Sequence, residues 1–203
     1  WNGLIVEEEA FSVTYNSAGG SSVNSGSFAS GGAIQTAPSS TRPGYTFLGW
    51  STSVNGSVIE FPYSPTSNVD ITLYARWQLN NGEFKCSTGV PLVGDDTSPS
   101  YTISNGALSA GDDCVGAVVI PSGVTTISNM AFSHAFSITS VDIPNGVTSI
   151  GEESFTSATQ LASIDIPASV LIIGNNAFRN ARALATINVD ISNANYTSID
   201  GAL

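Results

Sequence analysis

The 203-residue chain has little charge, and most of that charge is negative. Charged side chains make up 10% of the residues, against roughly 25% in ordinary globular proteins. Sixteen acids oppose five bases, which gives a net charge of −11. Binding to nucleic acid requires clusters of lysine and arginine that neutralise phosphates, so this composition excludes a nucleic-acid partner.

Long hydrophobic runs and catalytic motifs are also missing from the sequence. No run approaches the ~18 apolar residues of a membrane helix, and no secretory signal is visible, so we expect no membrane contact by this chain. The one histidine, His134, has no nucleophile motif, phosphate loop or metal-ligand cluster to act with. We therefore expect no enzyme, no cofactor and no resident metal.

What the chain does have is a 23-residue period in its second half. Three segments align without gaps, at residues 118–140, 141–163 and 164–186. Such a fixed period predicts a solenoid, in which each unit buries its apolar face only against its neighbours. The period is marked by Pro121, Pro144 and Pro167; Val124, Val147 and Val170; Ile127, Ile150 and Ile173; Phe132, Phe155 and Phe178; and Ile138, Leu161 and Leu184.

Each unit predicts a short strand, a proline turn and a buried Ile-Gly-x-x-x-Phe stretch. Proline ends the strand because it lacks the N–H group that a ladder requires. Stacking at the repeat distance predicts a parallel sheet, with the phenylalanines filling the core behind it. Its inward positions are Val118, Val141, Ile164 and Ile187 in one row, and Ile120, Ile143, Ile166 and Val189 in the next.

The signature Ile-Pro-x-x-Val-x-x-Ile-Gly-x-x-Ala/Ser-Phe at residues 143–155 and 166–178 resembles the BspA-like leucine-rich repeats, also known as the Treponema pallidum type. Residues 120–132 depart once, with serine in place of glycine. Asp190 replaces the next proline, and residues 195–201 resemble a variant unit common later in such arrays. The resemblance implies a surface-exposed bacterial protein, and some members of the family are adhesins that bind host or neighbouring-cell proteins.

The first part of the chain predicts short strands separated by glycine turns. Residues 11–15 and 71–77 alternate as half-buried strands do, and Pro43-Gly44 predicts a tight turn before an aromatic run. The sequences Val-Thr-Tyr-Asn, Thr-Arg-Pro-Gly-Tyr-Thr-Phe-Leu-Gly-Trp and Leu-Tyr-Ala-Arg-Trp follow one another in this region. Together they resemble the Listeria–Bacteroides repeat, or internalin B-repeat, which implies a small β-grasp-like spacer without catalytic residues.

The aromatic residues of this module have two possible roles. A carbohydrate platform is one, but we favour a core, because small β domains need large side chains to bury enough area. The residues concerned are Tyr15, Tyr45, Phe47, Trp50, Tyr74 and Trp77.

Both ends of the sequence interrupt a pattern. Trp1 lies one repeat length before Trp77, so we interpret it as the closing tryptophan of a preceding copy, the alternative being a chance tryptophan. We interpret the acidic run Glu7–Glu9 as part of a solvated linker and favour this over a cation site. Because Leu203 falls inside a repeat, we expect the chain to be a piece of a longer protein.

Residues 79–116 match neither pattern and contain both cysteines. Two cysteines in an extracellular-looking chain favour one disulfide, Cys86–Cys114, worth about 3–4 kcal/mol by loop closure. The end of a solenoid needs shielding, so we interpret the segment as a stapled cap containing a hairpin at residues 101–108. Zinc and redox readings fit poorly, because His134 is distant and no C-x-x-C spacing exists.

Two acidic pairs lie in the same segment, Asp95-Asp96 and Asp112-Asp113. Hard cations such as calcium want several oxygen ligands, but the regular D-x-D-x-D-G spacing is missing. We favour solvated turn residues, and the sequence leaves calcium open.

Alternate side chains of a strand point to opposite faces, so each solenoid strand leaves residues on an outer, concave face. An ordinary solvated sheet face explains these residues as well as a partner surface does. They also include none of the exposed aromatics that supply binding hot spots. The residues are Val119, Asp142, Asp165 and Asn188, flanked by Ala117, Ser140, Ser163 and Thr186.

The sequence thus predicts a mainly β protein in four parts. Residues 1–10 end a preceding repeat and form a linker, 11–78 form the β-grasp-like module, 79–116 the cap, and 117–203 a leucine-rich solenoid with a parallel sheet. We expect a cell-surface or secreted bacterial protein whose solenoid binds extracellular or cell-surface proteins, or copies of itself. The alternatives are a structural stalk, fibre or surface layer, and an accessory region of a secreted enzyme.

Overall fold

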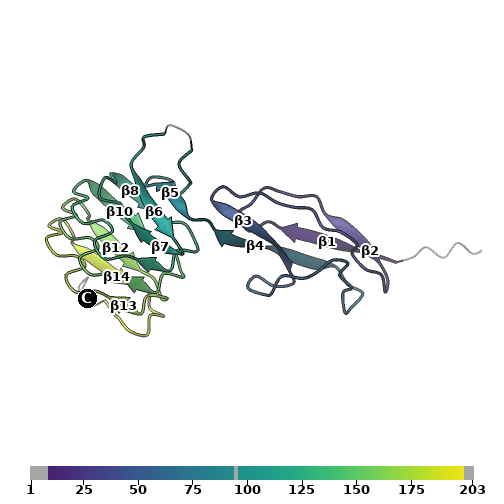
Figure 1. Cartoon of the computed structure of the whole chain (residues 1–203). Helices are drawn as coiled ribbons and strands as arrows, with labels where there is room; N and C mark the ends of the chain where they lie inside the picture. Colours follow the sequence, from purple (N-terminus) through teal and green to yellow (C-terminus); the bar gives the residue numbers. More distant parts are fainter. Residues whose placement is uncertain (1–8, 94–95, 199–203) are drawn as a thin grey trace, which may run out of the picture. The chain divides into compact units, whose positions relative to one another are not determined.

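The computed structural model describes residues 9–93 and 96–198, which form two compact units, Trp1–Gln78 and Leu79–Leu203 (Figure 1). All regular elements in these described ranges are β-strands. The described residues accordingly include no helix long and apolar enough to cross a membrane. The mainly β class predicted from the sequence is confirmed.

The first unit is a mixed sheet of four strands in the order β2-β1-β4-β3. The strands are β1 (Ala10–Asn16), β2 (Gly26–Ala29), β3 (Tyr45–Ser51) and β4 (Ile71–Leu79). Strand β1 is antiparallel to β2 and parallel to β4, as in a β-grasp sheet. The two strands predicted from alternation are β1 and β4, and the predicted turn at Pro43-Gly44 is closed by the Tyr45 N–H bond to the Arg42 carbonyl (3.1 Å).

The core of this unit lies on one face of the sheet. Val13 and Leu73 are fully buried, and Trp50 is 1% exposed and donates its indole N–H to the Pro38 carbonyl (2.7 Å). Tyr15, Phe47 and Trp77 are partly buried and pack against the same cluster. Four of the six aromatic residues therefore serve the core, as expected, while Tyr45 and Tyr74 remain half-buried outside that cluster.

The second unit stacks its repeats into a solenoid with two rows of strands (Figure 1). The first row is a six-stranded sheet in the order β13-β11-β9-β7-β6-β5. Its solenoid rungs β7, β9, β11 and β13 are parallel, and β6 and β5 add antiparallel strands at one edge. The bounds are β5 (Gly82–Lys85), β6 (Ser100–Ser104), β7 (Ala107–Ser109), β9 (Thr126–Ile127), β11 (Ser149–Ile150) and β13 (Ile172–Ile173).

The second row contains the strands predicted from the repeat, and their register is the predicted one. Val141 pairs with Val118, and Ile164 pairs with Ile187. The expected single sheet is divided into two parallel pairs, β8 with β10 and β12 with β14, and the Ala162 N–H bond to the Thr139 carbonyl (3.3 Å) links them. The bounds are β8 (Gly116–Val119), β10 (Ile138–Asp142), β12 (Ser163–Ile166) and β14 (Thr186–Val189).

The predicted phenylalanine stack holds the turns together between the two rows. The ring centroids of Phe132 and Phe155 are 5.2 Å apart, and those of Phe155 and Phe178 are 5.6 Å apart, with nearly parallel planes. Neighbouring turns also bond through the backbone, since the Phe155 N–H donates to the Ala177 carbonyl (2.8 Å). Each turn is thus fixed by its neighbours, as a solenoid requires.

The repeated glycine has a packing reason. A Cβ at Gly151 would lie 2.5 Å from the Asn129 nitrogen, and one at Gly174 would lie 2.3 Å from the Glu152 nitrogen. The backbone of the preceding turn therefore leaves no room for a side chain at either position. Ser128 occupies the equivalent site in the first turn, where the cap strand β7 precedes it and the Ser128 N–H bonds the Leu108 carbonyl (2.8 Å).

Candidate recognition surface

The side chains predicted to face outward from β10, β12 and β14 are exposed and form one row, which we call the polar strip. The register places Ser163 beside Thr186 and Asp165 beside Asn188. The intervening Ile164 is 1% exposed, so alternate residues of each strand are anchored in the core. The polar strip comprises Ser140, Asp142, Ser163, Asp165, Thr186 and Asn188.

Val119 pairs in register with Asp142, as the sequence pattern predicts, but it is less exposed than the rest of the row. Its side chain is half-buried, while the flanking Ala117 is exposed. The cap binds its backbone on both sides: the Val119 N–H donates to the Cys86 carbonyl (2.8 Å), and the Tyr101 hydroxyl donates to the Val119 carbonyl (2.5 Å). The exposed strip therefore begins at β10, because the cap engages the strand before it.

The polar strip is negatively charged. Asp142 and Asp165 supply two carboxylates, and none of the five bases lies in β10, β12 or β14. The side-chain amide of Asn188 donates to Asp165 Oδ1 (2.7 Å), which fixes the orientation of that carboxylate. A basic residue outside these strands, Arg179, approaches Glu153 at 3.9 Å.

A hollow of about 340 Å³ opens where these strands end, and we call it the carboxyl-end hollow. Sequence reasoning missed it, and the one available signal was the loss of proline at Asp190. The Asp190 N–H, which a proline would lack, donates to the Ile166 carbonyl (2.9 Å), and the carboxylate lines the hollow. The full lining is Ile143, Asn145, Asp165, Ile166, Pro167, Asn188, Val189 and Asp190.

The variant unit that follows Asp190 packs back onto the third repeat. The Asn193 amide donates to the carbonyls of Pro167 (2.9 Å) and Val170 (3.0 Å). The Tyr196 hydroxyl accepts the Ile173 N–H (2.9 Å). These bonds hold the side of the hollow that β14 and its following turn supply.

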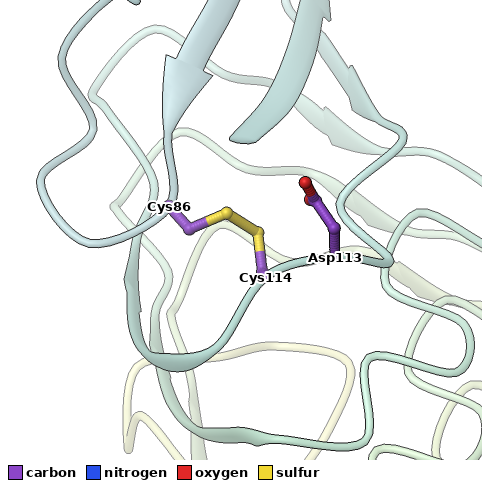
Figure 2. A group of neighbouring side chains, drawn as sticks. All are labelled: Cys86, Asp113 and Cys114. Atoms are coloured by element: carbon purple, nitrogen blue, oxygen red, sulfur yellow. A yellow bond between two sulfur atoms is a disulfide. The ribbon is translucent and has the colours of Figure 1, made fainter. Parts of the chain in front are cut away.

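The predicted disulfide is present at the other end of the solenoid. Cys86 and Cys114 are joined with their Cα atoms 5.6 Å apart, and both residues are 1% exposed (Figure 2). The Asp113 carboxylate lies near the two sulfurs, but sulfurs bonded to each other provide no thiolates for a metal. Asp113 instead accepts the Ser100 N–H (3.3 Å), which ties this turn to β6 within the cap.

The acidic turns of the cap differ in what they do. Asp96 forms an ion pair with Lys85 and accepts a hydrogen bond from the Ser98 hydroxyl (2.6 Å). The Lys85 ammonium, followed by Ser98, holds the pKa of the Asp96 carboxyl well below its usual range. Asp112 is exposed. Asp96 is therefore engaged within the cap, which leaves it poorly placed to serve a cation.

His134 is exposed in the turn beside Phe132, as expected, and its ring nitrogen Nδ1 lies 2.9 Å from the Ser133 hydroxyl. Its backbone has a positive φ of 66°, and the equivalent Ser157 and Asn180 have 62° and 59°. Three different side chains thus occupy one backbone conformation. The position is set by the geometry of the turn, and nothing in it depends on an imidazole.

Several sequence interpretations concern residues outside the described ranges. They are Trp1 as the end of a preceding copy, most of the Glu7–Glu9 run, Asp95, and the end of the variant unit from residue 199 onward.

Comparison with known families agrees with this architecture. The model of the BspA type leucine rich repeat region matches residues 101–201 in six copies, and the model of the Listeria-Bacteroides repeat domain matches residues 11–76. The first match begins inside the segment interpreted as a cap, where β7 already pairs in parallel with β9. Both families are repeat domains.

One solved structure that matches is a leucine-rich repeat protein from Eubacterium ventriosum ATCC 27560. It is 18% identical, with a TM-score of 0.25, and the match covers 60% of this chain and 47% of that chain. No curated protein matches the chain. The chain is therefore a modular bacterial repeat protein that carries a Listeria–Bacteroides repeat domain followed by a BspA-type leucine-rich repeat region.

Proposed function

We propose that the solenoid recognises another protein through the polar strip, at the bacterial cell surface or outside the cell, with the N-terminal module as a spacer. The observation that carries this proposal is the regular presentation of six exposed polar side chains from three strands, whose alternate residues are buried in β10 and β12 and partly buried in β14. Side chains held on a rigid core lose little further freedom when a partner binds. Leucine-rich repeat regions, moreover, usually mediate contacts between proteins.

The test is capture of a defined partner by the whole chain. The immobilised protein is exposed to a panel of purified extracellular-matrix and cell-surface proteins, and binding is measured by biolayer interferometry. Ser163→Arg places a long cation on β12, the middle strand of the strip, and we expect it to abolish the captured interaction. Asn175→Arg, at an exposed position of a turn outside the strip, is the matched control and should leave binding unchanged.

A structural role is the second candidate, and the last rung of the first row favours it. Among the described strands, β13 lies at the edge of its sheet, and its residue Ile172 and the preceding Leu171 are 60% and 55% exposed. An exposed apolar edge strand is a template for pairing with another chain. Sedimentation that shows concentration-dependent assembly, together with an empty capture panel, would replace recognition with self-assembly as the function.

A further inference from the structure

The carboxyl-end hollow combines an apolar floor with a polar, acidic rim. Ile143 and Ile166 in the floor are 7% and 1% exposed, and Pro167 and Val189 are half-buried beside them. The carboxylates of Asp165 and Asp190 and the amides of Asn145 and Asn188 complete the lining. The hollow is therefore suited to a side chain with an apolar stem and a polar, cationic end.

Both carboxylates are held in place by the protein. Asp165 Oδ1 accepts the Asn188 amide (2.7 Å), and Asp190 Oδ1 accepts the Ser192 N–H (2.8 Å). No other described residue donates to either carboxylate, so each Oδ2 keeps its acceptor capacity. Fixed acceptors of this kind bind a cation without a further loss of side-chain freedom.

The charge around the hollow is uncompensated. Asp142 adds a third carboxylate on the polar strip, none of the strands that end at the hollow carries a base, and the whole chain has a net charge of −11. The two carboxylates and two amides have six side-chain oxygens, but Asp165 Oδ1 and Asp190 Oδ1 already accept hydrogen bonds, so fewer oxygens remain free than the six to eight ligands of a calcium site. Charge complementarity thus favours an organic cation supplied by a partner.

We propose that the carboxyl-end hollow binds an arginine side chain presented by the partner protein. The aliphatic stem packs on the Ile166, Pro167 and Val189 surface, and the guanidinium donates to Asp165 and Asp190. The planar guanidinium has five donors in a fixed fork, which matches two separate carboxylates better than the single ammonium of lysine does. This inference rests on the proposed function, since it names the chemistry of the partner at one end of the strip.

The test uses the whole chain, labelled with ¹⁵N, and a small probe. The blocked peptide acetyl-Gly-Arg-Gly-amide is titrated at constant ionic strength, and the matched peptide contains citrulline, which has nearly the same shape without the charge. We expect the arginine peptide to shift the signals of Ile166, Asn188 and Asp190 and to bind about tenfold more tightly than the citrulline peptide. Equal binding of the two peptides would overturn the proposal.

Single charge changes separate the hollow from general attraction to an acidic protein. Asp165→Asn and Asp190→Asn should each weaken the arginine peptide severalfold. Glu152→Gln in the second repeat and Glu83→Gln in the cap remove the same charge outside the hollow and the strip, and binding should be almost unchanged; thermal melting verifies that all four variants fold. A loss of affinity as large for Glu152→Gln as for Asp165→Asn, or displacement of the peptide by millimolar Ca²⁺ at the same signals, contradicts an arginine site.

The proposal and the function on which it rests fail in different ways. A protein captured from the panel that binds the Asp165→Asn and Asp190→Asn variants as well as the unchanged chain overturns the arginine site alone. An empty panel, with the arginine peptide still mapping to the hollow, counts against recognition of those proteins and supports the site itself.

Discussion

The two units of this protein bury their apolar side chains in different ways. Among its described residues, the first unit has a small core of six buried side chains, with Trp50 as the largest, and partly buried aromatics around it. The solenoid repeats similar residues from turn to turn, so Phe132, Phe155 and Phe178 stack at nearly equal distances. The stability of a small core depends strongly on its largest side chain. In a stack, stability is distributed over many interfaces between turns, and the cost of losing one ring depends on whether it lies in the middle of the stack or at its end.

The largest effect is expected where one side chain dominates a small core. Trp50→Ala removes an almost fully buried indole and its bond to Pro38, which should cost about 3–5 kcal/mol and unfold the first unit. Differential scanning calorimetry should show the loss of one transition, with the transition of the solenoid retained. Val69→Ala, at a 53% exposed position of the same unit, is the control. Loss of both transitions would show that the two units do not fold independently.

A similar deletion in the stack tests its dependence on position. Phe155 is fully buried between two other rings, whereas Phe178 is only half-buried. Phe155→Ala should therefore cost about 3–5 kcal/mol and Phe178→Ala distinctly less. Urea unfolding of the two variants gives the comparison. Equal losses would mean that the end of the stack is as well packed as its middle.

Removal of the staple should have an effect of intermediate size. The Cys86–Cys114 bridge spans a sequence separation of 28, so Cys86→Ser with Cys114→Ser should lower stability by about 3–4 kcal/mol on the loop-entropy argument. We expect the solenoid to melt at a lower temperature and the first unit to be unchanged. Thiol titration of the unchanged protein after denaturation provides the control, because two reactive thiols without reductant would mean that the bridge had not formed.

The sequence predicted the parts of this fold that are repeated or follow a strict alternation. Because each turn of the solenoid contains 23 residues, stacking places Val141 beside Val118. Alternation along β1 and β4 follows from strand geometry. Parallel pairing of β7 with β9 was not predictable, because its spacing is shorter than the repeat. That rung is formed by backbone hydrogen bonds to the cap hairpin, such as the Ser128 N–H bond to the Leu108 carbonyl (2.8 Å), which the repeat pattern does not encode.

The candidate site was likewise predictable only where it follows a regular pattern. The six residues of the polar strip follow from alternation and were identified correctly as exposed. Val119 also has the predicted register, beside Asp142, but it is half-buried where the cap, a segment outside the repeat, engages its strand. The hollow depends on Asp190 standing where proline stands in the earlier repeats, and a periodic pattern is least informative at the unit that breaks it. Deviations from the repeat are therefore where function is best sought in this chain.

The smallest predicted effect compares two buried serines, one in each unit. Ser154 is fully buried, its hydroxyl has no hydrogen-bond partner among the described residues, and Ala131 and Ala177 occupy the equivalent sites. Ser51 is equally buried, but its hydroxyl donates to the Ser53 carbonyl (2.9 Å). Ser154→Ala should stabilise the solenoid by about 1 kcal/mol, and Ser51→Ala should destabilise the first unit by about as much.

Chemical denaturation of each variant measures whether the free energy of unfolding rises or falls. The same substitution acts in opposite directions because only Ser51 exchanges its bond to water for a bond within the protein, while Ser154 loses the first without gaining the second. A loss of stability in Ser154→Ala would mean that a buried water satisfies this hydroxyl between the turns. The stack would then contain a polar contact that the alanines of the neighbouring repeats do not have, and the repeats would be less equivalent than their register indicates.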